Sequence, residues 1–405
     1  MPKKLILFTL MISISIIIIN CFKTQNWNTN NVNYNIDKTI ESSNTSNTQG
    51  SPIIDPIDSL ISKMTLHEKI CQMIITTPEK LEETVYTSFS GDKLKTALEN
   101  YPVGGLVYFA DNLDSVEQTQ NMIDGTKQIA KDLSILPLFF SIDEEGGKVA
   151  RCADKLGTTK FSPMYEYRNA GIETAYNNAY TIAKDISSLG FNLNFAPVAD
   201  TWSNKENTVI GTRAYSDDFS QTAELVASAV KGFQDGGVFC TLKHFPGHGD
   251  TTEDSHYETA YSNKTAEELA SGEYLAFKSG IDAGVDMIMM GHITHPLIDT
   301  LPSSLSNKVI QKELRGKLNY DGVIITDSLA MNSVTKMYST DELAVMAIKA
   351  GNDILLMPSD LELTVNGILN AIENGEITEK RINESVKRIL ELKSFRLKLR
   401  LEDVH

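Results

Sequence analysis

One stretch of the chain, Lys243–His256, concentrates the side chains that could do chemistry. It holds three histidines, three carboxylates and a lysine within fourteen residues. The stretch directly follows Val238–Leu242, an apolar run typical of a buried strand. Titratable groups gathered behind a strand, rather than spread over helix faces, indicate a functional site on a loop.

A carboxylate that could act as a nucleophile lies further along the chain. Asp327 follows the run Val323–Thr326, which is expected to be a buried strand. A buried strand directly before Asp327 would fix the direction of its side chain. Cations such as Lys243 or Arg213 could offset the cost of desolvating this carboxylate. The pattern therefore predicts a fixed carboxylate beside positive charge.

An acid–base pair is predicted at the end of the first stretch. Asp254 and His256 flank Ser255, and residues two apart in an extended or turned loop can point the same way. The carboxylate would then accept a hydrogen bond from one ring nitrogen, which orients the imidazole and raises its basicity.

A metal site is an alternative interpretation of the same histidines. His244 and His248 are four residues apart, as in helical zinc motifs. The intervening Phe245-Pro246-Gly247 opposes a helix, so the spacing loses its geometric meaning. A zinc site formed by His244, His256 and His292 stays open at this point.

The elements that must position these residues form a repeating pattern. From Pro56 onward, nearly continuous apolar runs alternate with longer amphipathic stretches, which is typical of a parallel sheet covered on both faces. Eight such runs predict one α/β domain over residues 55–405, a single (β/α)8 barrel with no second C-terminal domain. The predicted strands are Gln72–Thr76, Gly105–Phe109, Leu136–Ile142, Phe191–Val198, Val238–Leu242, Val285–Met290, Gly322–Thr326 and Asp353–Met357.

Polar side chains follow several of these strands at the point where each one ends. The carboxyl ends of barrel strands form one rim, where barrel active sites lie. Residues far apart in the sequence are therefore expected to meet there. The side chains at these ends are those of Asp143, Asp200, Lys243, His244, His292 and Asp327.

Composition narrows the class of partner. The 405 residues carry a net charge of −16, which disfavours nucleic acid, because phosphate binding requires clustered Lys and Arg. Four cysteines are too few for a disulfide scaffold, and the absence of a CxxC pair disfavours a thiolate zinc site.

The N-terminus is predicted to be an export signal. Lys3 and Lys4 precede the apolar run Leu5–Ile19, and Cys21 closes residues 1–21 in the manner of a bacterial lipoprotein. Lipid attachment at Cys21 would anchor the protein on the outer face of the cytoplasmic membrane; an uncleaved anchor and simple secretion are the alternatives. Residues 22–54 are rich in Asn, Ser and Thr, which predicts a flexible stalk.

Five segments together resemble glycoside hydrolase family 3, in particular its bacterial β-N-acetylglucosaminidases. The resemblance runs from about Ile61 to about Leu392, in the family's order. The most diagnostic segment is KHFPGHG followed by DSH. The segments are Ile142–Arg151, Asn194–Asp200, Ile210–Tyr215, Lys243–Gly249 with Asp254–His256, and Thr326–Leu329.

The resemblance implies a retaining exo-β-N-acetylglucosaminidase acting on cell-wall fragments or related glycosides, without a metal or cofactor. Asp327 matches the nucleophile that forms a covalent glycosyl-enzyme. His256 matches the general acid/base and Asp254 its partner. The residues that match the holders of the terminal N-acetylglucosamine are Asp143, Arg151, Arg213, Lys243 and His244.

Two positions depart from the family's pattern. Lys148 stands where arginine is usual, and Glu144 where glutamine is common, so a bidentate contact at position 148 is not expected. The loop Gly247–His256 is expected to move to deliver His256. A phosphorylase of the same family, a metal-dependent hydrolase and a wall-binding lipoprotein with a dead site are the alternative functions.

Overall fold

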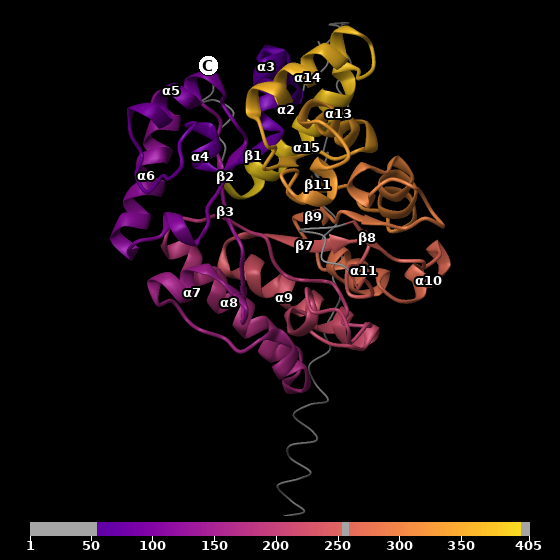
Figure 1. Cartoon of the computed structure of the whole chain (residues 1–405). Coiled ribbons are helices and arrows are strands. Elements are labelled where there is room, and N and C mark those ends of the chain that lie inside the picture. Colours follow the sequence, from indigo (N-terminus) through magenta and orange to yellow (C-terminus); the bar gives the residue numbers. More distant parts are fainter. Residues whose placement is uncertain (1–54, 253–258, 398–405) are drawn as a thin grey trace, which may run out of the picture. The chain divides into compact units, whose positions relative to one another are not determined.

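The computed structural model of the chain describes residues 55–252 and 259–397. Eight strands pair side by side, all parallel, in the order β11-β9-β7-β6-β3-β2-β1-β12. A parallel bridge between Ile325 and Ile354 joins the two ends of this row, so the sheet closes on itself (Figure 1). The predicted (β/α)8 barrel is confirmed. Its strands are β1 (Ile74–Thr76), β2 (Gly105–Val107), β3 (Phe139–Ile142), β6 (Leu193–Asn194), β7 (Phe239–Phe245), β9 (Met287–Met290), β11 (Val323–Thr326) and β12 (Leu355–Leu356).

All eight predicted strands exist, but several of their boundaries were wrong. Gln72 ends a helix instead of opening β1, and Val198 pairs only through an isolated bridge to Lys243. The apolar runs are longer than most strands because buried residues flank the hydrogen-bonded pairs as well. β7 is the exception, since it continues through Lys243 and His244 to Phe245, so both of these polar residues lie within the strand.

Helices surround the barrel, and side chains cap the starts of several of them. Thr265 and Ser339 each form a capping box at the start of α10 and α13, and α15 begins at Glu379. The helices are α2 (Pro56–Lys63), α3 (Leu66–Gln72), α4 (Pro78–Leu81), α5 (Asp92–Asn100), α6 (Val116–Asp132), α7 (Arg151–Leu156), α8 (Ile172–Ser188), α9 (Phe219–Gly236), α10 (Ala266–Ser271), α11 (Tyr274–Asp282), α12 (Asn332–Thr335), α13 (Thr340–Ala350), α14 (Leu361–Glu373) and α15 (Glu379–Leu397).

Shorter elements decorate the barrel. An antiparallel pair, β4 (Glu144–Gly146) and β5 (Val149–Ala150), follows β3, and a parallel pair joins β8 (Ala260–Tyr261) to β10 (Ile293–Thr294). Four short 3₁₀ segments and one π-helix complete the described elements: η1 (Ala110–Asn112), η2 (Met164–Ala170), η3 (Gly211–Arg213), η4 (Ser303–Leu305) and η5 (Lys308–Lys317).

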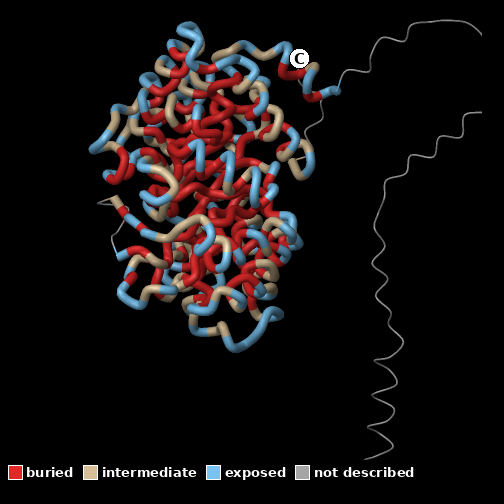
Figure 2. The backbone as a smooth tube through the Cα atoms, turned by 90° about the vertical axis from the view of Figure 1, so that its right-hand side faces the viewer, coloured by how far each residue is buried: buried red, intermediate tan, exposed pale blue. Residues whose placement is uncertain are grey.

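Burial follows the barrel architecture. The strands are buried inside, and exposed residues lie on the surrounding helices and loops (Figure 2). Neighbouring helices come very close: a Cβ added at Gly232 of α9 would lie 2.3 Å from the carbonyl oxygen of Tyr176 in α8. Only glycine permits this approach.

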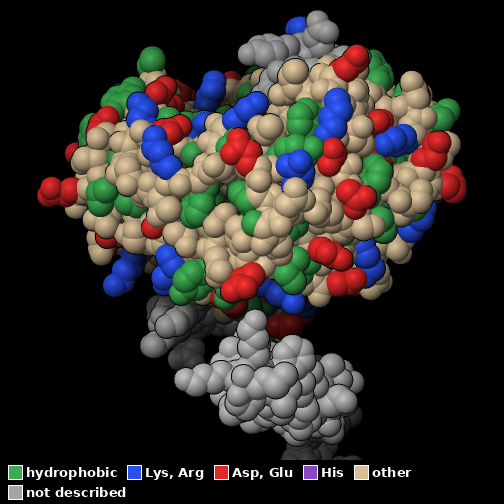
Figure 3. Space-filling model, turned by 90° about the horizontal axis from the view of Figure 1, so that it is seen from below, with side chains coloured by type: hydrophobic (Ala, Val, Ile, Leu, Met, Phe, Trp, Pro, Cys, Tyr) green, Lys and Arg blue, Asp and Glu red, His purple; other side chains and the backbone are tan. Residues whose placement is uncertain are grey.

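Acidic and basic side chains are interspersed over the face of the domain that Figure 3 shows. Within residues 55–252 and 259–397, none of the helices combines the length and apolar character needed to cross a membrane. The predicted export segment (residues 1–21, with Cys21), the stalk (22–54), Asp254 and His256 lie outside the described residues and stay predictions.

Candidate active site

The register of three neighbouring strands brings several predicted residues to one end of the barrel. Met290 of β9 pairs with Phe245 of β7 on one side and with Thr326 of β11 on the other. The next residue of β11 is Asp327, whose amide donates a hydrogen bond to the Met290 carbonyl at 2.9 Å. The carboxyl ends of these strands therefore place a partly exposed Asp327 at the same rim as His244.

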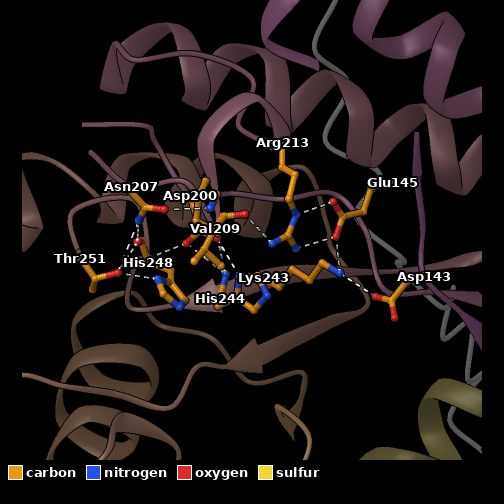
Figure 4. A network of polar contacts seen from close by, with 11 residues as sticks. Asp143, Glu145, Asp200, Asn207, Val209, Arg213, Lys243, His244, His248 and Thr251 are labelled. Carbon is orange, nitrogen blue, oxygen red and sulfur yellow. Dashed lines mark hydrogen bonds and ion pairs between the residues drawn. The ribbon is translucent and has the colours of Figure 1, made fainter. Parts of the chain in front are cut away.

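A network of five charged side chains occupies this rim; Figure 4 labels four of them, Asp143, Glu145, Arg213 and Lys243. Lys243 Nζ lies 2.7 Å from both Asp143 Oδ1 and Glu145 Oε1. Arg213 donates two parallel hydrogen bonds to Glu145, from Nε at 2.9 Å and from Nη2 at 2.8 Å. Arg151 completes the network with an Nη2 contact to Asp143 at 3.3 Å. Four of the five predicted sugar-binding residues thus meet in one ion-pair network.

Burial and charge oppose each other throughout this network. Burial would raise the pKa of Asp143, but the Lys243 and Arg151 charges bring it below the ordinary value. Burial would likewise raise the pKa of Glu145, yet Arg213 and Lys243 depress it strongly. For Lys243, burial works against the charge, and the two carboxylates outweigh it and raise its pKa. All these groups therefore stay ionised at neutral pH.

His244, the fifth predicted sugar-binding residue, lies beside the network on β7. Its Nδ1 is 2.7 Å from Oδ2 of the fully buried Asp200. Glu145 and Asp200 are the two residues of the site to which the sequence analysis gave no role. Glu145 was only part of a motif, and Asp200 only one of six polar residues at strand ends, although that position was the available signal.

His248 lies beside His244, and the charge of Asp327 acts on it. Its ring is buried, with Nδ1 2.7 Å from the Thr251 hydroxyl, and it meets the His244 ring edge-on at 5.8 Å between centroids. Burial and the neighbouring His244 lower the pKa of His248 to about 4, although the Asp200 and Asp327 charges act in the opposite direction. His248 is therefore neutral at neutral pH, and Asp327 is close enough to influence it.

His292, after β9, supports the segment that carries Asp327. Its Nε2 lies 2.9 Å from the Ser328 carbonyl, which can only accept, so Nε2 donates. Its Nδ1 lies 2.7 Å from the Ser304 hydroxyl. Ser328 in turn donates its amide to Asp327 Oδ1 at 2.7 Å, so the carboxylate is held on one side.

Arg151 is positioned from two directions. Its guanidinium carbon lies 4.8 Å from the centre of the Phe109 ring, in a cation–π contact. Arg151 also opens α7, whose Cys152 and Ala153 amides donate to the Glu144 carboxylate at 2.7 and 3.1 Å. Lys148 is exposed between β4 and β5.

Metal binding finds no support in the part of the chain that the structure describes. Within residues 55–252 and 259–397, no three His, Cys, Asp or Glu side chains are grouped to hold a metal ion. His244 and His248 lie on a strand and its following turn, not on a helix, as the intervening Pro and Gly predict. A zinc site that includes His256 is not tested, because that residue lies outside the described ranges.

The loop that carries the predicted acid–base pair is firmly seated at its start. Gly247, His248, Gly249 and Thr251 are buried, and a Cβ at Gly249 would lie 1.7 Å from the Thr201 carbonyl oxygen. Movement of the whole segment from Gly247 would break these contacts. The expected motion of Gly247–His256 therefore stays a prediction only for its later residues.

Comparison with known proteins identifies the family of the chain. The model of the glycosyl hydrolase family 3 N-terminal domain matches residues 65–392. A β-hexosaminidase A from Pseudoalteromonas piscicida is 30% identical over 374 residues, which cover 81% of this chain and 62% of the relative. A β-hexosaminidase from Haemophilus influenzae is 33% identical over 285 residues, which cover 69% of this chain and 78% of the relative.

A solved structure gives the same result. The family 3 β-N-acetylglucosaminidase from Paenibacillus sp. strain FPU-7 superposes with a TM-score of 0.78 at 38% identity. The match covers 82% of this chain and 63% of that protein, so this chain spans less than two thirds of the length of that enzyme. With the family model matching most of the sequence and the barrel fold shared, the chain belongs to glycoside hydrolase family 3.

Proposed function

We propose that the protein is a retaining exo-β-N-acetylglucosaminidase that removes terminal N-acetylglucosamine from cell-wall fragments or related glycosides. The observation that carries the proposal is the ionised network at the rim that also holds Asp327. The names of the relatives support the reaction class, since two are β-hexosaminidases and one is a β-N-acetylglucosaminidase.

The network is suited to holding a polar ring. Asp143 accepts hydrogen bonds, while Lys243, Arg151 and Arg213 donate them, so together they can satisfy both functions of sugar hydroxyls. Because the charges already pair with one another, they are oriented before the sugar arrives. Such preorganisation fixes the anomeric carbon relative to a nearby nucleophile.

In the proposed reaction, an Asp327 oxygen attacks the anomeric carbon as the bond to the leaving oxygen breaks. His256, oriented by Asp254, gives its proton to that oxygen. His256 then takes a proton from water, which attacks the anomeric carbon and releases the Asp327 carboxylate with net retention. The roles of His256 and Asp254 rest on the resemblance, because both lie outside the described residues.

The role of Asp327 can be tested by substitution and by trapping. Asp327→Asn should lower kcat for an aryl N-acetylglucosaminide by roughly 10⁴-fold, because the covalent route is lost. A fluorinated mechanism-based sugar should label Asp327 in the native protein, as read by peptide mass spectrometry. Label on another carboxylate, or a variant with normal turnover, would refute the assignment.

The retaining stereochemistry is tested separately. NMR of the first-released sugar should show the β anomer.

The role of His256 is tested through the leaving group. His256→Ala should slow substrates with poor leaving groups far more than activated aryl glycosides, which need little acid assistance. Equal losses on both substrates would show that His256 is not the acid. Repeating the assay with phosphate and with a chelator separates the phosphorylase and metal-dependent alternatives, and no turnover on any aryl N-acetylglucosaminide would favour the wall-binding alternative.

A further inference from the structure

Asp200 collects several donors at the carboxyl end of β6. Its carboxylate is fully buried just beyond the bridge between Val198 and Lys243. The backbone amide of His244 lies 3.2 Å from each of its oxygens, and the amide of His248 lies 2.6 Å from Oδ1 (Figure 4). The third partner is the Nδ1 atom of His244, 2.7 Å from Oδ2.

The groups around the Asp200 carboxylate indicate where the proton of the Asp200–His244 pair lies. Burial alone would raise the pKa of Asp200, but its interactions with His244 and His248 bring it below the ordinary value. An ionised carboxylate can only accept hydrogen bonds. Nδ1 of His244 must therefore carry a hydrogen and donate it to Asp200.

This arrangement decides what the opposite edge of the His244 ring can do. When Nδ1 carries the only ring proton, Nε2 has a lone pair and is an acceptor. Nε2 forms no hydrogen bond with any residue of 55–252 or 259–397, and 9% of the side chain stays exposed. The neighbouring Lys243 and Arg213 can only donate, so an acceptor at Nε2 complements them.

We propose that Asp200 is a positioning residue for sugar binding: it holds His244 in the tautomer whose Nε2 accepts a hydrogen bond from a sugar hydroxyl. The proposal rests on the proposed function for the identity of the ligand. The tautomer itself does not depend on that function and is measured on the free protein.

An asparagine at position 200 should not reproduce the hydrogen bonds that Asp200 accepts. All three groups facing the side chain are N–H donors, and a carboxylate offers enough lone pairs for all of them. A carboxamide presents one NH₂ group toward at least one of these donors. His244 would then turn its ring or exchange its tautomer to relieve the clash.

Two-bond ¹H–¹⁵N correlation spectra of the ¹⁵N-histidine-labelled full chain report this tautomer. His244→Gln identifies the His244 signals by their loss. The expected native pattern at neutral pH is a protonated Nδ1 and a bare Nε2, and titration with free N-acetylglucosamine should shift the Nε2 signal. A native ring that is protonated on Nε2, or doubly protonated, overturns the proposal whatever the activity.

Asp200→Asn is expected to lose the native pattern and to raise KM for an aryl N-acetylglucosaminide about 10- to 100-fold, with a smaller change in kcat. Asp353→Asn is the matched control, because Asp353 is also fully buried and accepts a backbone amide, but at the amino end of β12. It should lower stability without changing the His244 signals or KM. Equal effects of both variants on KM would reduce Asp200 to a structural role and contradict the proposal.

Failure of the native protein to cleave the substrate would instead refute the proposed function, while the free-protein tautomer measurement would still stand.

Discussion

At the scale of single residues, Glu145 holds the site together. It accepts from Lys243 and bidentately from Arg213, and its side chain is almost completely buried. The five-membered network sets three cations against two carboxylates. Removing the charge of Glu145 would leave Asp143 alone to balance three buried or half-buried cations, which is costly because unpaired charges are poorly solvated there.

The substitution Glu145→Gln should therefore strongly lower both stability and activity. We expect the free energy of unfolding to fall by about 3–5 kcal/mol, because Lys243 and Arg213 lose their shared partner. Catalytic efficiency should fall at least roughly tenfold, because both cations lose their fixed orientation. Urea unfolding and initial rates on an aryl N-acetylglucosaminide measure the two effects.

The control for this change is an exposed acid. Asp154 forms an ion pair with Lys160 at 3.1 Å in which both side chains are largely exposed. Asp154→Asn should shift stability by less than about 0.5 kcal/mol and leave the rate unchanged. If Glu145→Gln behaved like Asp154→Asn, the network would contribute nothing to the site.

Most residues of the site could be predicted from the sequence, but the ion pairs and hydrogen bonds between them could not. The sequence places Asp143, Lys243 and Asp327 at strand ends, and the resemblance adds Arg151 and Arg213. Neither shows that one buried carboxylate serves two cations, or that three N–H donors meet at one aspartate. Such convergence depends on side-chain directions in the closed barrel, and neighbouring acids in the sequence look alike before folding.

Among the secondary-structure elements, Glu144 and its neighbour Glu145 have different structural roles. Glu145 points into the network, while Glu144 caps α7 through the amides of Cys152 and Ala153. Its backbone is tied to the Asn194 side chain, so the β4–β5 pair and α7 are held as one unit. The cap fixes the helix that begins with Arg151, and the helix N-terminus favours a negative partner.

The cap has a predictable pH dependence. Burial raises the pKa of Glu144 from 4.5 to about 7, although the two amides act against the rise. The folded chain therefore holds this proton more tightly than the unfolded chain, and stability falls as pH rises between these values. Glu144→Gln has no proton to lose, so relative to the native protein it should gain about 2 kcal/mol between about pH 5 and about pH 8.

Chemical denaturation at both pH values measures that gain. Glu391→Gln, an exposed position on α15, provides the comparison and should show no such trend. A difference between Glu144→Gln and the native protein that stays constant with pH, or that falls as pH rises, would show that Glu144 does not titrate in this range.

Element types were easier to predict from the sequence than element ends. Apolar runs identified every barrel strand, because burial on both faces requires them. The ends depended on where pairing partners stop, which is a property of neighbouring strands. β7 is the instructive case, since Lys243 and His244 look like the start of a loop but continue the strand. Buried ion pairs and hydrogen bonds compensate both residues there.

At the scale of the whole described domain, α15 closes the ring of barrel units. Its Arg381, Ser385 and Arg388 surround the fully buried Asp353, which precedes β12. Further along, Lys393 donates to the Gln72 side chain and the Gly104 carbonyl, both at 2.9 Å. Figure 1 shows α15 beside the first helices, α2 and α3. The last helix thus joins the first and last units at the amino end of the barrel.

This closure depends on pH through Lys393. Its side chain is fully buried, and burial lowers its pKa from 10.5 to about 7. Between these values the unfolded chain binds a proton that the folded chain does not, so stability rises with pH, in contrast to the trend at Glu144. A neutral amine still has two N–H groups for its two acceptors, so the contacts survive deprotonation.

Lys393→Met should remove this pH dependence while also losing both hydrogen bonds. Relative to Lys393→Met, the native protein should therefore gain about 3 kcal/mol between about pH 7 and about pH 10, where its lysine becomes neutral. Lys380→Met, an exposed position on the same helix with 86% of its side chain exposed, should show no comparable trend. Urea unfolding across this range measures the difference. A native protein that loses stability relative to Lys393→Met as pH rises would mean that the buried amine stays charged, and that α15 closes the barrel through an ion rather than through two neutral hydrogen bonds.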